Sequence, residues 1–89
     1  MKSSIEINAA IMREKMHEYM QEFLNIGLHM TFCNAIYYHQ ISNRIYCIIG
    51  ISDIDGIVYY FDNTMSNWNL MPSNVYKMMQ SNINFKRLF

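Results

Sequence analysis

Apolar residues recur at alternating spacings of four and three along the first part of the chain. This stripe consists of Ile5, Ala9, Met12, Met16, Tyr19, Phe23 and Ile26. Such spacing is typical of one face of an amphipathic helix. Ser3 and Glu6 form a capping-box pattern that begins a helix, and Gly27 supplies the left-handed residue at which many helices end. The pattern predicts a helix over residues 4–26.

This helix would be long for a chain of 89 residues. At about 1.5 Å per residue it measures roughly 34 Å, whereas an ordinary strand measures about 17–20 Å. Part of the apolar stripe is therefore expected to extend beyond the sheet and to pack on a partner or on a second copy of the chain. The residues expected there are Met12, Met16, Tyr19 and Phe23. The alternative is a helix that its own fold covers completely.

After Gly27 the apolar residues follow a period of two, which is typical of strands. Residues 29–39 alternate in this way. Residues 45–52 are apolar on both faces, as in a central strand, and residues 57–61 are β-branched and aromatic. The sequence therefore predicts three strands.

Short connections join these strands. Asn43 belongs to a turn after the first strand, and Asp55-Gly56 indicates a two-residue hairpin of type I′ between the second and third. Such short links favour an antiparallel meander. A polar loop follows, and Pro72 suits the first turn of a second helix over residues 72–82. We expect one α+β domain, residues 1–89, of order α-β-β-β-α. A three-stranded antiparallel sheet would pack against the long N-terminal helix and the short C-terminal one.

The stretch Asp53-Ile54-Asp55-Gly56 follows an apolar strand and resembles the first motif of haloacid-dehalogenase-type phosphatases. The resemblance implies a nucleophile at Asp53, a general acid/base at Asp55 and a magnesium ion. Ile57, however, stands where that family usually has threonine. Only 33 residues follow Gly56, too few for the large parallel sheet of the family. A turn between two strands fits better, with Asp55 and Gly56 in the left-handed conformation and Asp53 in solvent.

The remaining residues that could bind a metal or act in catalysis lack the spacing that such sites need. His17, His29 and His39 have no ligand spacing, and no glutamate follows Gly56 to complete a calcium loop. Cys33 and Cys47 sit in apolar runs and are expected to be buried free thiols. We therefore expect no catalytic residue, no metal and no cofactor, and the chain is predicted not to be an enzyme.

Composition points to contact surfaces. The chain is 52% hydrophobic and 16% charged, against about 25% charged in an ordinary domain. Apolar area left at the surface commonly marks a partner site. Net charge is zero, so no strongly basic footprint for nucleic acid is present. The apolar runs are too short for a membrane span of about 20 residues, and the N-terminal stretch carries charges, unlike a signal peptide. A cytoplasmic protein is expected.

We therefore predict a small protein-binding module, an inhibitor or adaptor, that self-associates as a homodimer. Its expected contact residues are Met12, Met16, Tyr19, Phe23 and Trp68. The abundance of Ile, Asn, Tyr and Met, which have A+T-rich codons, favours a low-GC genome and makes a phage or mobile element plausible.

Two other functions remain open. The first is binding of a small ligand or single-stranded nucleic acid on an aromatic sheet face. The tyrosines of that face would be Tyr37, Tyr46, Tyr59 and Tyr60. The second is a metal-dependent enzyme at Asp53 and Asp55.

Overall fold

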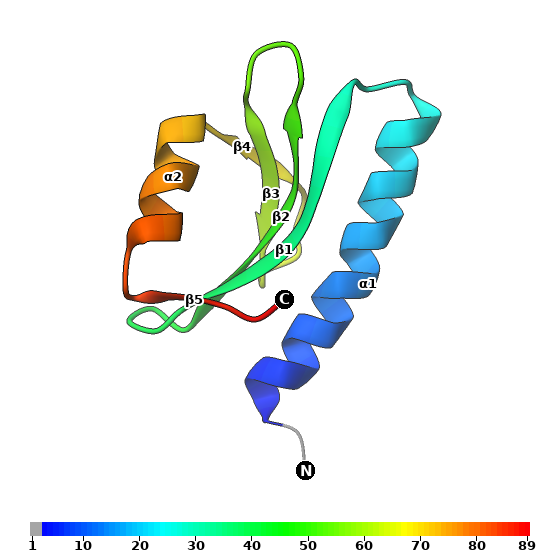
Figure 1. Cartoon of the computed structure of the whole chain (residues 1–89). Helices are drawn as coiled ribbons and strands as arrows, with labels where there is room; N and C mark the ends of the chain where they lie inside the picture. The colour runs from blue at the N-terminus through cyan, green and yellow to red at the C-terminus, as the bar shows by residue number, and fades with distance from the viewer. Residues whose placement is uncertain (1–2) are drawn as a thin grey trace.

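The computed structural model describes residues 3–89 and has three layers, a five-stranded sheet between two helices (Figure 1). In chain order the elements are α1 (Ser4–Asn25), β1 (Met30–His39), β2 (Arg44–Ser52), β3 (Val58–Asp62), β4 (Asn69–Met71), α2 (Ser73–Ser81) and β5 (Phe85–Arg87). Figure 1 views the sheet along its edge, with α1 on the right and α2 on the left. The α+β class and the antiparallel sheet are as predicted. Within residues 3–89, neither helix combines the length and the apolar character that crossing a membrane requires.

The sheet has the strand order β4-β3-β2-β1-β5, and every pair is antiparallel. The meander of β1, β2 and β3 is confirmed, but the prediction of three strands is wrong. Strand β4 lies in the segment expected to be a loop, and β5 lies in the C-terminal tail, where it pairs with β1. Each has three residues, too few for an alternating pattern to be visible in the sequence.

Helix α1 begins and ends as the sequence indicates. The backbone N–H of Glu6 donates to Ser3 Oγ at 3.2 Å, which satisfies one free donor of the first turn. Gly27 has φ +76°. The N–H of Leu28 donates to Phe23 O and that of Gly27 to Leu24 O, at 3.0 and 3.2 Å. This pair of bonds is a Schellman motif, so Gly27 closes the helix and directs the chain into β1.

The expectation that Met12, Met16, Tyr19 and Phe23 lie beyond the sheet is wrong, because the central strands are longer than average and cover these four residues. Helix α1 has 22 residues and measures about 33 Å. Strand β1 has 10 residues and, at about 3.4 Å per residue, measures about 34 Å. Helix and strand are therefore similar in length, and Figure 1 shows them side by side except at the N-terminal end of α1, which projects past the sheet. The sheet covers the stripe from Ala9 to Phe23.

Helix α2 begins at Ser73, one residue after the predicted Pro72, which precedes the helix in an extended conformation. Its buried residues are Tyr76 and Met79. Val75 and Met78 of the same helix are 42% and 66% exposed. The helix thus buries a narrow stripe on the sheet and leaves two apolar side chains beside it.

The hairpin between β2 and β3 is confirmed, but its turn type is not. The two strands pair antiparallel, with Cys47 opposite Phe61. Gly56 has φ +73° while Asp55 does not have positive φ, so this is not a type I′ turn. The N–H of Gly56 donates to Ser52 O, and the N–H of Ser52 to Ile57 O, both at 2.9 Å. Four residues, 53–56, form the connection, and glycine alone takes the left-handed position.

Gly50 lies where β2 passes close to β1. A Cβ atom at this position would lie 2.7 Å from Met30 Cγ and 2.8 Å from Thr31 O. The side chain of Met30 can move, but the carbonyl of Thr31 is held in the sheet. Glycine is therefore required here by the close approach of two strands.

We predict that Gly50→Ala lowers the free energy of unfolding by about 1–3 kcal/mol, because overpacking displaces neighbouring atoms. Urea denaturation monitored by circular dichroism measures this change. Adding Met30→Ala removes the side-chain contact but leaves the contact with Thr31 O, so it does not restore the stability of the wild type. A Gly50→Ala variant as stable as the wild type would contradict this account of the strand packing.

Candidate functional site

The four helix residues expected at an interface lie in the core of the chain. Met12, Met16 and Phe23 are at most 1% exposed, and Tyr19 is 8% exposed. They pack on the face of the sheet formed by Ile36, Ile45, Cys47, Ile49 and Phe61. A partner could contact these four side chains only if α1 left the sheet.

Trp68, the fifth expected contact residue, is half-buried in the loop before β4. Its ring meets those of Phe23 and Tyr59 at centroid distances of 5.6 and 5.3 Å. Edge-to-face and tilted contacts of this kind add to the stabilisation from burial. Trp68 therefore holds its loop over one end of the α1 core and presents only part of its ring to solvent.

We predict that Met16→Ala lowers the free energy of unfolding by about 2–5 kcal/mol, because it leaves a cavity in the core. The matched control is Ile11→Ala on the same helix, where the side chain is 49% exposed; there we expect a loss below about 1 kcal/mol. Urea denaturation measures both. If Met16→Ala left stability unchanged but reduced the mass seen by light scattering, Met16 would be an interface residue rather than a core residue.

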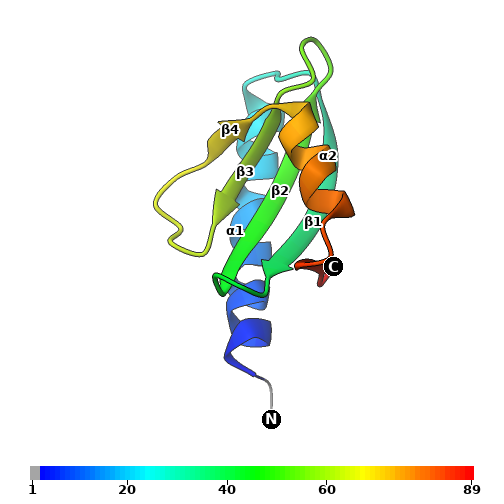
Figure 2. The same cartoon turned by 90° about the vertical axis from the view of Figure 1, so that its left-hand side faces the viewer.

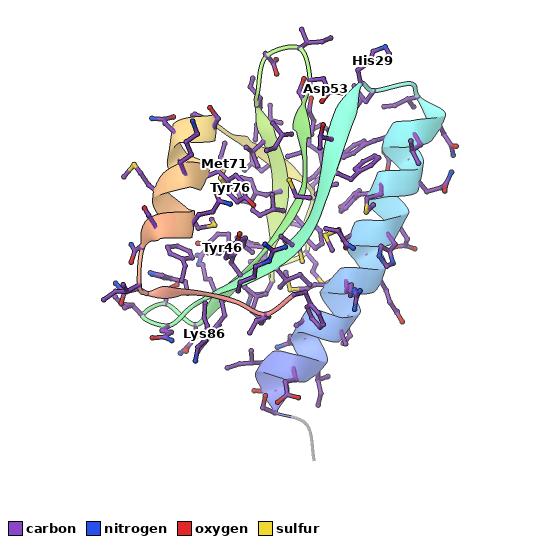
Figure 3. The ribbon with its side chains drawn as sticks, viewed as in Figure 1. His29, Tyr46, Asp53, Met71, Tyr76 and Lys86 are labelled. Atoms are coloured by element: carbon purple, nitrogen blue, oxygen red, sulfur yellow. The ribbon has the colours of Figure 1, made fainter. Side chains whose placement is uncertain are left out.

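Asp53 has a structural role at the end of β2. Its N–H donates to His29 O at 3.0 Å, and its carboxylate accepts from Thr31 Oγ1 at 2.7 Å. Figure 3 shows Asp53 and His29 at the same end of the sheet. Asp53 thus ties the end of β2 to the start of β1, an interaction that a turn alone would not require.

Asp55 caps its own turn. Its carboxylate accepts from the N–H of Ile57 at 3.1 Å. This bond and a hydrogen bond with Ser52 lower the pKa of Asp55. The two carboxylates of the motif therefore have separate hydrogen-bonding partners. No group of three or more His, Cys, Asp and Glu side chains within residues 3–89 is placed to hold a metal ion.

Asp62, at the end of β3, pairs with Arg44 on β2 at 3.1 Å. Burial acts to raise the pKa of Asp62, but hydrogen bonds from Thr64 and the charge of Arg44 outweigh burial, so this pKa is below its ordinary value. A carboxylate whose pKa is lowered by folding stabilises the folded state at pH values above the pKa that it has in the unfolded chain. That stability is lost as the pH falls through the folded-state pKa.

We predict that Asp62→Asn lowers the free energy of unfolding by up to about 1 kcal/mol at neutral pH, as for other exposed ion pairs. The difference from the wild type should be smaller near pH 2.5, below the ordinary aspartate pKa of about 3.9, because protonation removes the charge that pairs with Arg44. Urea denaturation at the two pH values measures this. An equal difference at both pH values would show that Asp62 acts through its shape rather than its charge.

A groove lies between α2 and the sheet, with a volume of about 350 Å³; we call it the α2 groove. The sheet contributes Tyr46, Tyr60, Met71 and Phe85 to its lining. The helix side contributes Val75, Met78, Met79 and Asn82. Figure 2 shows the cause: α2, with nine residues, crosses only part of the sheet face and leaves parts of β2 and β3 uncovered.

Aromatic rings form the floor of the α2 groove. The ring of Tyr46 meets those of Tyr60 and Phe85 at centroid distances of 6.2 and 5.9 Å, tilted by 47° and 52°. All three side chains are half-buried, and Figure 3 places Tyr46 between the sheet and α2. The floor is thus a set of rings that pack on one another.

The aromatic face expected from the sequence is divided between the two sides of the sheet. Tyr37, Tyr46 and Tyr60 belong to the α2 side, whereas Tyr59 packs with the α1 core. Tyr37 is 5% exposed and lies under Tyr76 of α2, with the rings 6.0 Å apart. The four tyrosines therefore do not form one open surface.

A second hollow, of about 320 Å³, adjoins the first and is lined by Ile57, Leu70, Met71 and Pro72. Met71 lines both hollows.

The thiols are poorly suited to nucleophilic chemistry. Burial raises the pKa of Cys47 to about 12. Burial also raises the pKa of Cys33, and this outweighs the opposing effects of Arg87 and of a hydrogen bond with Tyr76. A thiol with a raised pKa holds little of the reactive thiolate at neutral pH. Both cysteines are free, and Cys47 is buried as expected, whereas Cys33 is half-buried.

The chain matches no protein-family model, no curated protein and no solved structure. Its function therefore has to be argued from its own geometry.

Proposed function

We propose that the protein is a non-enzymatic protein-binding module and that the α2 groove receives an apolar segment of its partner. The supporting observation is that Met78, at 66% exposure, stands beside a hollow of about 350 Å³ with an aromatic floor. Exposed apolar surface that the chain does not cover commonly marks a contact site. An inhibitor or adaptor of a phage or mobile element remains the biological setting we favour.

The lining of the groove supports binding rather than catalysis. It consists of methionine, valine, tyrosine and phenylalanine with one amide, Asn82. Aromatic residues and methionine are enriched at protein interfaces, and methionine adapts its shape to different partners. Within the part of the chain that the structure describes, this lining includes no carboxylate, histidine or cysteine to transfer a proton or attack a substrate.

The proposal does not include a homodimer through α1, because the stripe that suggested one packs on the sheet of the same chain. The proposed contact surface is instead on the opposite side of the sheet. We place the protein in the cytoplasm, and its two free cysteines support this, since reducing compartments keep thiols unpaired.

We predict that Met78→Glu weakens partner binding at least about tenfold, because a charge would then be buried against apolar groups. The matched control is Ile11→Glu, which puts the same charge on α1 across the sheet, at a side chain of 49% exposure. Affinity purification from the source cells with the wild type and both variants, followed by titration of the retained protein, makes the comparison.

The proposal holds if the wild type and Ile11→Glu retain the same protein and Met78→Glu loses it. Because Met78 is exposed, Met78→Glu should keep the unfolding free energy within about 0.5 kcal/mol of the wild type. A partner retained equally by Met78→Glu would overturn the proposed site.

A further inference from the structure

The outer edge of β1 is paired along only part of its length. Strand β5 pairs with β1 from Tyr37 to His39, and the N–H of Ile36 donates to Phe89 O just beyond them. Strand β1 begins well before this point, at Met30. Figure 1 shows β5 at the lower end of β1, whereas β1 begins at its upper end. Among the residues that the structure describes, no strand pairs with residues 30–34 on the side away from β2; we call these residues the free edge.

Two residues of the free edge direct their backbone groups away from the sheet. The C=O of His29 accepts from the N–H of Asp53, on the β2 side. The backbone groups of successive residues in a strand face alternate sides. Those of Met30 and Phe32 therefore face away from β2. Such unpaired N–H and C=O groups are a template on which another strand can pair.

The usual protection of a sheet edge is missing from most of the free edge. Proteins block edges with lysine, proline, bulges or very short strands. Strands β4 and β5 have three residues each, and β5 carries Lys86. Residues 30–33 contain neither lysine nor proline. A bulge occurs only at the inner end, where Asn34 has φ +49°. The free edge is therefore open to a further strand.

One flank of α1 lies beside the free edge and is apolar there. Arg13 lies over the ring of Phe89, 4.7 Å from its centroid, and Phe89 is bonded to β1 at Ile36. Met20 and Leu24 follow Arg13 by seven and eleven residues, which places them on the same flank of the helix. Met20 is half-buried, and Leu24 is 57% exposed. A strand added to the free edge would cover Leu24.

The two faces of the free edge indicate which side chains such a strand carries. Met30 and Phe32 are half-buried and pack with the α1 core, whereas Thr31 is exposed. Residues 28–35 contain no Asp, Glu, Lys or Arg. A charge turned toward α1 would therefore be buried without a partner, which is costly. The strand should alternate apolar residues, on the α1 side, with uncharged polar ones.

The size of the free edge limits its occupant. At about 3.4 Å per residue, residues 30–34 extend over about 17 Å. A stable interface between two folded proteins takes about 20–30 residues on each side. The free edge with Met20 and Leu24 is much smaller than this. It is too small for a stable dimer and matches a short extended segment.

From the unpaired backbone, the apolar flank and the size we propose that the free edge binds a short, uncharged, extended segment of a partner protein as an additional strand. Hydrogen bonds to the backbones of Met30 and Phe32 hold the segment, and its apolar side chains contact Phe32 and Leu24. A helix does not fit, because its own backbone groups are bonded internally. This surface is separate from the α2 groove and gives the protein a second contact with a partner.

The test uses a capped peptide with the central sequence Val-Thr-Val-Thr-Val, which has one apolar and one polar side when extended. The control peptide has the same side chains but carries N-methyl groups on these five backbone nitrogens, so it cannot donate backbone hydrogen bonds. The protein carries ¹⁵N throughout and ¹³C in its methionine methyl groups. The N–H groups of Met30 and Phe32 report on the free edge, that of Ile36 on backbone already paired with Phe89, and the methyl group of Met78 on the α2 groove.

We predict that the unmodified peptide shifts the N–H signals of Met30 and Phe32 and, at saturation, slows their exchange with deuterium. The signals of Ile36 and Met78 should stay in place. The N-methylated peptide should bind at least about tenfold more weakly, since each lost hydrogen bond costs about 0.5–1.5 kcal/mol.

A pair of variants tests the contribution of α1. Leu24→Glu should weaken binding of the unmodified peptide at least about tenfold, because it puts a charge against the apolar side of the added strand. The matched control is Ile11→Glu on the same helix, at 49% exposure, which should leave binding unchanged. Both side chains are exposed, so both variants should keep the unfolding free energy within about 0.5 kcal/mol of the wild type.

Other outcomes overturn the proposal in distinguishable ways. Equal affinity for the two peptides would refute pairing through the backbone. No shift at millimolar peptide would refute the free edge as a site, while the purification experiment with Met78→Glu would still decide whether the α2 groove binds a partner. Shifts at Met78 instead of Met30 and Phe32 would move the peptide to the α2 groove. A mass that doubles at high protein concentration, with slow exchange at Phe32 before any peptide is added, would assign the free edge to a second copy.

Discussion

The fold depends on burying β2 on both faces. Ile45 and Ile49 point to the α1 side and Ile48 to the α2 side, and all three are at most 2% exposed. Full burial of side chains of this size contributes about 1.5–3 kcal/mol each. No arrangement with the two helices on one face could cover them, because the other face of β2 would then remain in water. The apolar character of this one strand therefore requires three layers.

The two covering helices are unequal, and the α2 groove follows from this inequality. Helix α1, with 22 residues, is similar in length to the long strands and packs its stripe from Ala9 to Phe23 on the sheet. Helix α2, with nine residues, is anchored by Tyr76 and Met79 and cannot reach the far parts of β2 and β3. The remaining sheet face is lined by half-buried rings rather than by polar groups. A short helix on a long apolar sheet thus produces an apolar hollow without any special loop.

Much of the fold could be predicted because the spacing of apolar residues repeats many times along the longer helix and strands. The stripe on α1 and the two-sided burial of β2 are both visible in the sequence. Strands β4 and β5 could not be predicted, since three residues show no period and tertiary pairing alone defines them. The prediction that Met12, Met16, Tyr19 and Phe23 lie beyond the sheet failed for another reason. It compared the helix with a strand of average length, whereas β1 and β2 have ten and nine residues.

The candidate site was harder to find because its parts are scattered. Tyr46, Tyr60, Met71, Met78 and Phe85 come from five elements, and two of these elements are the strands that the sequence does not reveal. One signal was nevertheless present. In α2, apolar residues lie on more of the circumference than Tyr76 and Met79 need for packing. This signal alone has an ordinary explanation, since apolar residues are common at protein surfaces. It is the topology, by pairing β5 with the edge of β1, that brings Phe85 beside Tyr46 and completes the aromatic floor of the groove.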